Sequence, residues 1–319
     1  MNWIAITGPH NTQAKMNNMI SSGSQIWVPE VLSDEQVTFF VENGYLAVSN
    51  LVSNDGIEEL RADTVKLARG GYPCETLEPV DSTLSDQDVL ASILCIHQPH
   101  FISELIEKYV KHPQISGALS QITAAHIPFW DGSVKCMQSM LFVKPPNFQG
   151  QAWHQDEIYI PTRDRSLIGA WIAMDDADVE NGCLWVIPGS HRQGYLYPQR
   201  SHRDQDEFDF ANESYGFDET EEIPVEVTTG TVVFFNGYLL HRSRKNRSQT
   251  YRRVLVNHYC NSWSLLPWNV AEGESVANAD RRSVVPVSGT DPYAWKGYEP
   301  TPNNVWLRQC KALTENEAS

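Results

Sequence analysis

Residues 134–143, Val-Lys-Cys-Met-Gln-Ser-Met-Leu-Phe-Val, mark the point at which the 319-residue chain changes from helical to strand-like patterning. The run is rich in β-branched, aromatic and Met residues, which favour extended structure. Pro, Gly and Asn pairs typical of turns lie between it and the similar runs that follow. A double-sheet jelly roll closes this many short strands, and we predict it as the core. The other runs are Ile168–Met174, Cys183–Ile187, Thr231–Phe235 and Arg252–Tyr259.

The residues before this run have helical patterns. Ser33-Asp-Glu-Gln36 has the form of a capping box, and the apolar residues after it recur at helical spacing until the stop signal Asn43-Gly44. Helices first and strands second predict an α+β, mainly β fold in which N-terminal helices buttress one face of the β core. Further helices are expected over residues 55–68, 101–110 and 114–125.

The size of the chain and the lack of a long flexible linker predict a single domain over residues 31–319, after a loosely ordered arm at residues 1–30. The jelly-roll core is expected at about 134–262, followed by a C-terminal extension over 263–319. An acidic segment with little apolar periodicity, 195–222, interrupts the strands. It is expected to be a surface loop, although loops of this length are also often lids over active sites.

Charge and cysteine content narrow the class of protein. A net charge of −16 argues against a nucleic-acid or anionic-membrane partner, because binding to phosphates needs a basic surface. The six cysteines form no Cys-x-x-Cys pair, which favours reduced thiols over disulfides or a zinc site. The chain has no membrane-length apolar run, no secretion signal and no C-terminal Ser-Lys-Leu. We therefore expect a cytoplasmic protein.

Candidate metal ligands lie in Gln151-Ala-Trp-His-Gln-Asp156. In an extended strand residues i and i+2 project to the same side, so His154 and Asp156 can reach one metal ion. His241 follows a later strand-like run that could return beside the first strand. Two histidines and a carboxylate leave coordination positions open for a cosubstrate and O₂, the arrangement of non-heme Fe(II) oxygenases. A second triplet, His202-Arg203-Asp204, matches the pattern but lies in a polar stretch, and we interpret it as a chance match.

An arginine pair opens the last of these runs, Arg-Arg-Val-Leu-Val-Asn-His-Tyr259. A guanidinium at the start of an apolar strand needs a fixed anion, and Arg binds carboxylates bidentately. A dicarboxylate cosubstrate would supply that anion to Arg252 or Arg253, whichever faces inward. The alternative is that both lie on a solvated basic edge with Arg242, Arg244, Lys245 and Arg247.

These motifs resemble the phytanoyl-CoA dioxygenase family of Fe(II)/2-oxoglutarate oxygenases over most of residues 33–265. The resemblance rests on Leu32 to Tyr45, on Trp-His-Gln-Asp156, on Trp171 to His191, and on Gly-Thr-Val-Val-Phe-Phe-Asn236 with His241 and Arg252 downstream. It implies a double-stranded β-helix, iron ligands His154, Asp156 and His241, and Arg252 as the partner of the distal carboxylate of 2-oxoglutarate. It also implies that Ser243, Gln138 and Trp171 line the cosubstrate pocket.

The implied activity is a dioxygenase that uses Fe(II), 2-oxoglutarate and O₂ to oxidise a small-molecule substrate, most simply by hydroxylation, with release of succinate and CO₂. Trp153, Glu157 and Tyr159 are substrate candidates because they are close to the ligands in sequence, although packing explains them equally well. The alternatives are a metal-dependent hydrolase or isomerase of the same fold, since such ligand sets also hold zinc, and a non-catalytic 2-oxoglutarate-binding protein. The sequence leaves the substrate and the oligomeric state open.

Overall fold

The computed structural model describes residues 25–268, 270, 272–301 and 304–309. Most of the expected N-terminal arm, residues 1–24, therefore lies outside the described residues, as does Cys310. Ile26 is bridged to Gly289, and the backbone N–H groups of Val31 and Leu32 donate to the side chain of Gln121. The described chain thus begins in contact with the domain.

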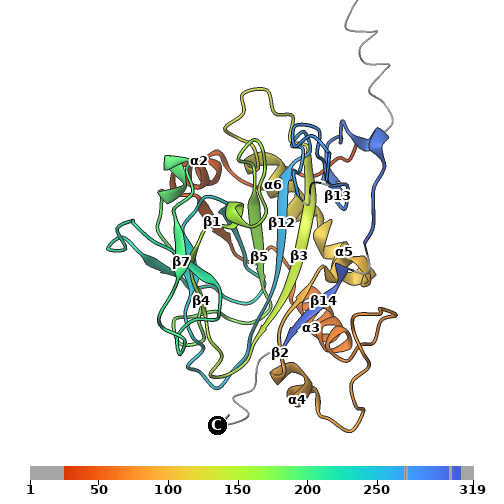
Figure 1. Cartoon of the computed structure of the whole chain (residues 1–319), viewed down its shortest axis with the longest axis vertical. Coiled ribbons are helices and arrows are strands. Elements are labelled where there is room, and N and C mark those ends of the chain that lie inside the picture. The colour runs from red at the N-terminus through yellow and green to blue at the C-terminus, as the bar shows by residue number, and fades with distance from the viewer. Residues whose placement is uncertain (1–24, 269, 271, 302–303, 310–319) are drawn as a thin grey trace, which may run out of the picture.

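Two antiparallel sheets form the core and confirm the jelly-roll prediction (Figure 1). The larger sheet has the order β1-β10-β5-β12-β3-β2-β14, with β13 also paired to β3, and the smaller has the order β4-β11-β6-β9. The strands of the larger sheet are β1 (Tyr45–Val48), β2 (Ile93–His97), β3 (Val134–Lys144), β5 (Ile168–Ala173), β10 (Val232–Asn236), β12 (Arg252–Asn261), β13 (Val285–Ser288) and β14 (Trp306–Gln309). Those of the smaller sheet are β4 (Gln151–His154), β6 (Leu184–Val186), β9 (Ile223–Val225) and β11 (His241–Ser243).

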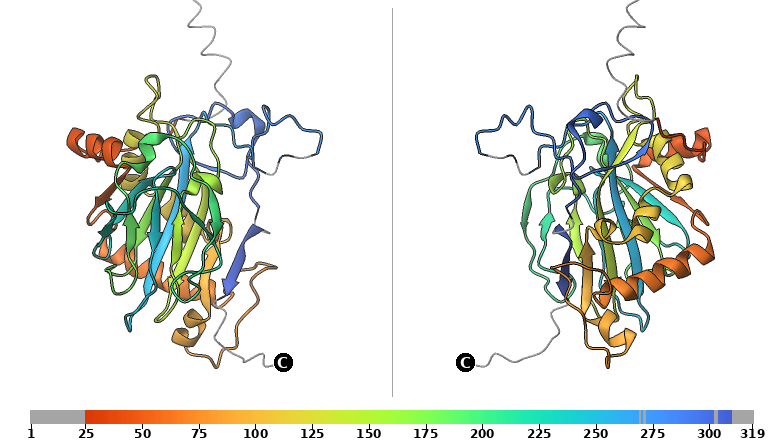
Figure 2. Two further views of the ribbon diagram at one scale, coloured as in Figure 1. Left: turned by 60° about the vertical axis from the view of Figure 1, so that its left-hand side comes forward. Right: turned by 90° about the vertical axis from the view of Figure 1, so that its right-hand side faces the viewer.

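The N-terminal helices cover one face of the larger sheet, as the sequence predicts (Figure 2). The capping box at the start of α2 is present, and Gly44 ends that helix in the left-handed conformation at φ 79°. The helices are α2 (Asp34–Asn43), α3 (Asn54–Ala68), α4 (Asp86–Ala91), α5 (Glu104–Val110) and α6 (Pro113–Ile122), and the short 3₁₀ turns are η1 (Pro99–Phe101), η2 (Asp156–Ile158), η3 (Ser190–Gln193) and η4 (Ala294–Lys296).

Side-chain alternation in β3 and β12 separates a helix-facing core from the pocket that holds the candidate site. Leu141, Val143 and Leu255 pack in the cluster that includes the helices. Their neighbours in the strands point to the other face, where Phe142 and Val256 belong to the cluster between the two sheets. The space between the sheets is therefore where polar residues of these strands would meet a ligand.

The acidic segment 195–222 is not a structureless loop, because it contains the hairpin of β7 (Gln199–Ser201) and β8 (Asn212–Ser214). Its carboxylates pair with the row of cations at and after β11. Glu222 contacts Arg242 and Arg244, Asp206 contacts Lys245, and Glu207 contacts Arg247. The basic edge considered in the sequence is thus neutralised by the acidic segment, and the segment is fixed against the smaller sheet.

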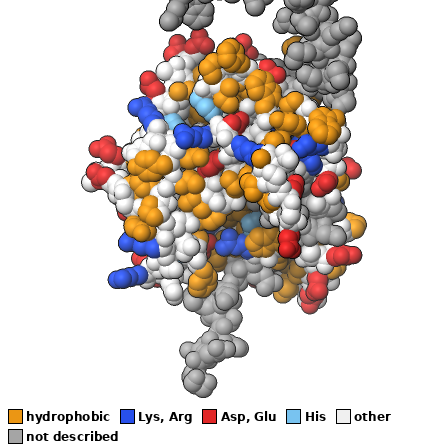
Figure 3. All heavy atoms as spheres, turned by 45° about the horizontal axis from the view of Figure 1, so that its top comes forward, with side chains coloured by type: hydrophobic (Ala, Val, Ile, Leu, Met, Phe, Trp, Pro, Cys, Tyr) orange, Lys and Arg blue, Asp and Glu red, His pale blue; other side chains and the backbone are white. Residues whose placement is uncertain are grey.

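The surface and the thiols add two observations. Four of the cysteines among the described residues, Cys95, Cys136, Cys183 and Cys260, are buried free thiols. In that part of the chain, no helix has the length and apolarity needed to cross a membrane. On the face seen in Figure 3, acidic, basic and apolar side chains are interspersed, so this face offers no continuous basic surface for a polyanion.

Candidate active site

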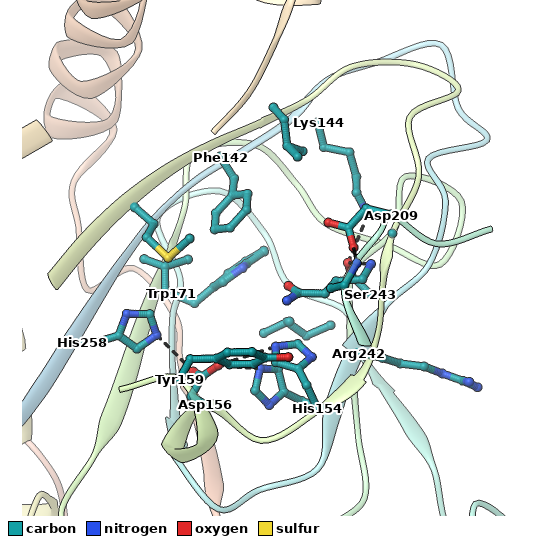
Figure 4. Close-up of a pocket in the computed structure, with 18 of the residues that line it drawn as sticks. Phe142, Lys144, His154, Asp156, Tyr159, Trp171, Asp209, Arg242, Ser243 and His258 are labelled. Atoms are coloured by element: carbon teal, nitrogen blue, oxygen red, sulfur yellow. Dashed lines mark hydrogen bonds and ion pairs between the residues drawn. The ribbon is translucent and has the colours of Figure 1, made fainter. Parts of the chain in front are cut away.

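Pairing of two short strands brings the predicted metal ligands together. In the β4–β11 ladder His241 lies directly opposite His154. Gln155 is extended at φ −127° and ψ 125°, so Asp156, at the start of η2, projects to the same side as His154. One donor atom from each of His154, Asp156 and His241 lies within 4.8 Å of the other two. The three side chains are buried, and their donor atoms converge on a single point; Figure 4 shows His154 and Asp156 side by side in the pocket.

Both imidazoles present the same nitrogen to this point. Nδ1 of His154 lies 2.8 Å from the carbonyl of Ala152, and Nδ1 of His241 lies 3.0 Å from that of Leu239. Because only a protonated nitrogen can donate to a carbonyl, Nε2 of each ring carries a free lone pair. Burial, and then the neighbouring His241, lower the pKa of His154 to about 4. His154 is therefore neutral, as a metal ligand must be.

The Asp156 carboxylate is oriented by a third histidine, His258 from β12. Nε2 of His258 lies 3.0 Å from Oδ2 of Asp156, whereas Oδ1 lies 3.5 Å from Nε2 of His154 and 3.6 Å from Nε2 of His241. Burial alone would raise the pKa of Asp156, but the surrounding histidines outweigh it and lower that pKa. The carboxylate is ionised, with one oxygen held by His258 and the other directed to the convergence point.

A cavity of about 340 Å³ opens beside these ligands, and only one of the two candidate arginines lines it. Arg252 lines it, and in that buried guanidinium Nε has no hydrogen-bond partner among the described residues. Arg253 points to the opposite face of β12, where its NH2 lies 2.7 Å from Oδ1 of Asp175. Burial lowers the pKa of Arg252 to about 10, which leaves it charged at neutral pH. Strand register therefore places Arg252 in the cavity and excludes Arg253.

The other expected cosubstrate residues, Ser243, Gln138 and Trp171, also line the cavity. The guanidinium carbon of Arg252 lies 5.5 Å from the centre of the Trp171 ring, within reach of a cation–π interaction. Oγ of Ser243 lies 3.2 Å from Nζ of Lys144, which is the cross-strand neighbour of Arg252. Burial and Arg252 keep the pKa of Lys144 well below its usual value. The charged guanidinium of Arg252, with the amino group of Lys144 as a nearby hydrogen-bond donor, makes this end of the cavity suited to an anion.

The three substrate candidates lie in different environments. Tyr159 lines the cavity, and its ring centre is 6.3 Å from that of His154. Trp153 points away, because neighbours in a strand face opposite sides, and its Nε1 donates to Glu219 at 2.9 Å. Glu157 is buried and accepts hydrogen bonds from the backbone and hydroxyl of Thr162, and burial raises its pKa to about 7. Neither Trp153 nor Glu157 lines the cavity.

The second His-x-Asp triplet forms no metal site among the described residues. Nε2 of His202 contacts the carbonyl of Asp209, and its ring packs against Phe208 at 5.7 Å. The clustered donors in the described part of the chain are instead His154, Asp156 and His241. The interpretation of His202-Arg203-Asp204 as a chance match agrees with this geometry.

Sequence reasoning missed two residues of the site, His258 and Lys144. Both could have been found from side-chain alternation, because His258 has the same parity as Arg252 in one strand and Lys144 the same parity as Gln138 in another. Figure 4 shows Lys144 on the same side of β3 as Phe142, while Arg242 points away from the pocket. The side that bears the inward arginine also carries the histidine that holds Asp156.

The residues of this site fit the Fe(II) ion and the 2-oxoglutarate that the sequence implies. Two imidazoles and one carboxylate on one side of a point are a donor set for Fe(II) with open coordination positions. The buried, unpartnered Nε of Arg252 fits a carboxylate that the protein itself does not supply. The chemistry of the donors thus agrees with an iron site beside a dicarboxylate site.

Comparisons with known proteins identify the family. The family model described as "Phytanoyl-CoA dioxygenase (PhyH)" matches residues 40–254. The chain belongs to the phytanoyl-CoA dioxygenase family. It is 31% identical to "Phytanoyl-CoA dioxygenase, peroxisomal" of Rattus norvegicus over 73% of this chain and 69% of that protein. It is 27% identical to "Phytanoyl-CoA dioxygenase 1" of Oryza sativa subsp. japonica over 74% of this chain and 93% of that protein.

A solved structure supports the fold. The crystal structure of EvdO2 from Micromonospora carbonacea var. aurantiaca complexed with 2-oxoglutarate covers 80% of this chain and 100% of that chain, with 20% identity and a TM-score of 0.55. Together with the family match, it confirms a jelly-roll oxygenase. The protein is an Fe(II)- and 2-oxoglutarate-dependent dioxygenase. This conclusion decides against the non-oxidative hydrolase or isomerase and the non-catalytic binding protein.

Proposed function

We propose that His154, Asp156 and His241 hold the Fe(II) ion and that Arg252 binds the distal carboxylate of 2-oxoglutarate. The observation that carries the proposal is the convergence of three donor atoms within 4.8 Å beside a cavity whose buried Arg252 lacks a partner for Nε among the described residues. An unpaired buried charge is costly, so a ligand carboxylate is the natural counter-charge.

Ser243, Gln138 and Trp171 complete the proposed cosubstrate site. Ser243 offers a hydroxyl between the backbone N–H of Gln151 and the ammonium of Lys144, each 3.2 Å away. Trp171 supplies a flat wall beside the guanidinium of Arg252. The charge of Arg252 at this end of the cavity favours a dicarboxylate over a neutral keto compound.

In the proposed mechanism, bound Fe(II) and 2-oxoglutarate supply the oxidising chemistry, in which O₂ is consumed and succinate and CO₂ are released. The chain provides orientation and a dry site. Nε2 of each imidazole and Oδ1 of Asp156 fix the position of the ion, and His258 prevents rotation of the carboxylate. The apolar side chains of Leu184, Phe235 and Val256 line the cavity and exclude water from the reacting centre.

The substrate is proposed to be a small molecule that is hydroxylated at a C–H bond placed near the ion. A cavity of about 340 Å³ is of the size that takes small ligands. The names of the rat and rice relatives specify phytanoyl-CoA for those proteins. Of the three substrate candidates, we retain Tyr159, because Trp153 and Glu157 face other parts of the structure.

Two measurements test the assignment. Anaerobic addition of Fe(II) and 2-oxoglutarate to the wild-type protein should produce a visible metal-to-ligand charge-transfer band, and Asp156→Ala should lose it. In air, the wild type should release succinate in an iron-dependent reaction. A wild-type spectrum that does not change on adding both components would contradict the assignment.

We also propose that the protein works in the cytoplasm. The four buried free thiols among the described residues support a reducing compartment. Burial raises the pKa of Cys183 to about 12 and that of Cys136 to about 12, so these thiols are unreactive at neutral pH. Location of a fluorescently tagged full chain in its own cells tests this proposal directly.

A further inference from the structure

A second cavity of about 660 Å³ adjoins the cavity beside the proposed iron ligands. Four residues line both cavities, namely His97, Gln138, Tyr159 and Ile160, and they form a neck between them. The outer cavity, which we call the vestibule, is also bounded by Trp268, Arg281 and Trp306. Trp268, Arg281 and Trp306 come from the C-terminal extension, outside the residues that match the family model. The vestibule is thus built jointly by residues inside the family match and by the C-terminal extension beyond it.

The charge of the vestibule differs from that of the whole protein. The chain has a net charge of −16, yet the described residues that line the vestibule include one arginine and no carboxylate. Arg281 forms no ion pair within the described part of the chain, although Glu299 lies near enough to oppose the lowering of its pKa by burial. The adjacent Arg282 has its charge balanced by Asp280 and Asp291. The vestibule therefore presents one positive charge that has no ion-pair partner among the described residues.

The position of Arg281 is fixed by its surroundings. Its backbone N–H donates to the carbonyl of Leu266 at 2.9 Å. Its guanidinium carbon lies 5.5 Å from the centre of the Trp268 ring, and Nε1 of Trp268 donates to the carbonyl of Pro161 at 3.1 Å. A guanidinium held over an anchored indole keeps its outer N–H groups directed to the cavity, with less side-chain entropy to lose on binding.

Another part of the vestibule wall, formed by His97 and Trp306, is flat and uncharged. The rings of His97 and Trp306 are stacked at 3.7 Å with an interplanar angle of 6°. Burial lowers the pKa of His97 to about 3, so the ring is neutral, and its Nε2 has no hydrogen-bond partner among the described residues. A stacked pair of this kind offers a face to a planar group and one unsatisfied polar atom at the neck.

We propose that the vestibule binds the primary substrate as an organic acid, with its ionised carboxylate on Arg281 and a planar or cyclic body between Trp268 and Trp306. The part of the substrate that carries the reacting C–H bond then extends through the neck beside Tyr159 to the proposed iron site. This inference rests on the proposed function, since it needs an oxidation at that site. It assigns substrate selection to the C-terminal extension and cosubstrate binding to the jelly roll.

The test uses a library of cyclic and aromatic carboxylic acids, each paired with its primary amide, and measures the stimulation of succinate release by wild-type holoenzyme. We expect stimulation by acids and not by the matched amides. For the best acid, Arg281→Gln should raise KM by about 10- to 100-fold, the loss expected for a hydrogen-bonded charge pair. Arg281→Lys should recover part of the loss, and Trp306→Ala should also raise KM.

The controls separate this inference from the proposed function. The KM for 2-oxoglutarate and the anaerobic charge-transfer band should be the same in Arg281→Gln as in the wild type, which also shows that the variant folds. Arg192→Gln removes an exposed arginine that lines neither cavity, and it should leave the KM for the acid unchanged. With the wild-type band present, the vestibule assignment is wrong if amides equal acids, if no acid stimulates release, or if Arg281→Gln has no effect on KM.

Discussion

Replacing His258 should weaken Fe(II) binding even though His258 is not among the proposed metal ligands. Its Nε2 lies 3.0 Å from Oδ2 of Asp156, and both side chains are buried. A hydrogen bond to a buried carboxylate contributes about 1.5–3 kcal/mol. Since about 1.4 kcal/mol is a factor of ten in an equilibrium constant, His258→Ala should raise the Kd for Fe(II) by about 10- to 100-fold, in the range expected for residues that orient metal ligands.

The geometry of the substituted side chain gives this prediction a sharper form. The bond uses the far nitrogen of the ring, so a glutamine amide has the reach to replace it and a shorter asparagine amide does not. His258→Gln should retain most of the affinity, whereas His258→Asn should resemble His258→Ala. The Kd is measured by anaerobic titration of Fe(II) into protein saturated with 2-oxoglutarate, followed at the charge-transfer band.

A matched control is His100→Gln, which changes a buried histidine that lines neither cavity and binds Ser139. It should leave the Fe(II) affinity at the wild-type value. If His258→Ala binds Fe(II) as tightly as the wild type, the reasoning that His258 orients Asp156 is refuted. If Ala, Asn and Gln at position 258 weaken binding equally, the donated hydrogen bond is not the cause.

The remaining predictions concern the ligands, the cosubstrate and pH. His154→Ala should abolish iron-dependent succinate release and His202→Ala should not; loss of activity in His202→Ala alone would overturn the choice of triplet. Arg252→Ala should raise the KM for 2-oxoglutarate by about 10- to 100-fold while Fe(II) still binds, whereas Arg253→Ala, which breaks the pair with Asp175, should lower the unfolding midpoint and leave that KM unchanged. Burial lowers the pKa of His100 to about 4, below the value of about 6.5 in an unfolded chain, so the unfolded state takes up the proton first and stability falls as pH drops from 6.5 to 4. His100→Gln should remove about 2–3 kcal/mol of that loss between pH 7 and 4.5 in urea unfolding, and an identical pH dependence in both proteins would contradict the role of His100.

The long and strongly patterned elements could be predicted from sequence. The helix at Asp34–Asn43 and the strand at Val134–Lys144 lie where the capping box and the apolar run place them. The short strand β2, Ile93–His97, was missed although its five residues are all buried. A five-residue apolar run between helices has no periodicity of its own, and it becomes a strand only because β3 and β14 pair with it.

The residues of the site also fall into those that sequence could predict and those that it could not. His154 and Asp156 follow from spacing and residue type, whereas spacing left Arg252 and Arg253 open and the family resemblance selected Arg252. The position of Trp153 depends on which side of β4 faces the pocket, and Arg281 enters the vestibule only through the fold of the C-terminal extension. The partners of the acidic segment were likewise out of reach, because Arg242 in β11 and Glu222 beside β9 are brought together by β6, which pairs with both strands.

The pairing of His241 opposite His154 has a consequence for biosynthesis. Until β11 has left the ribosome and joined β4, the growing polypeptide has only one imidazole and one carboxylate at this position. The His202-Arg203-Asp204 triplet offers the same two groups. At the proposed iron site, tight binding of the ion therefore requires β11 to be paired with β4, because a shorter nascent chain lacks the complete set of ligands.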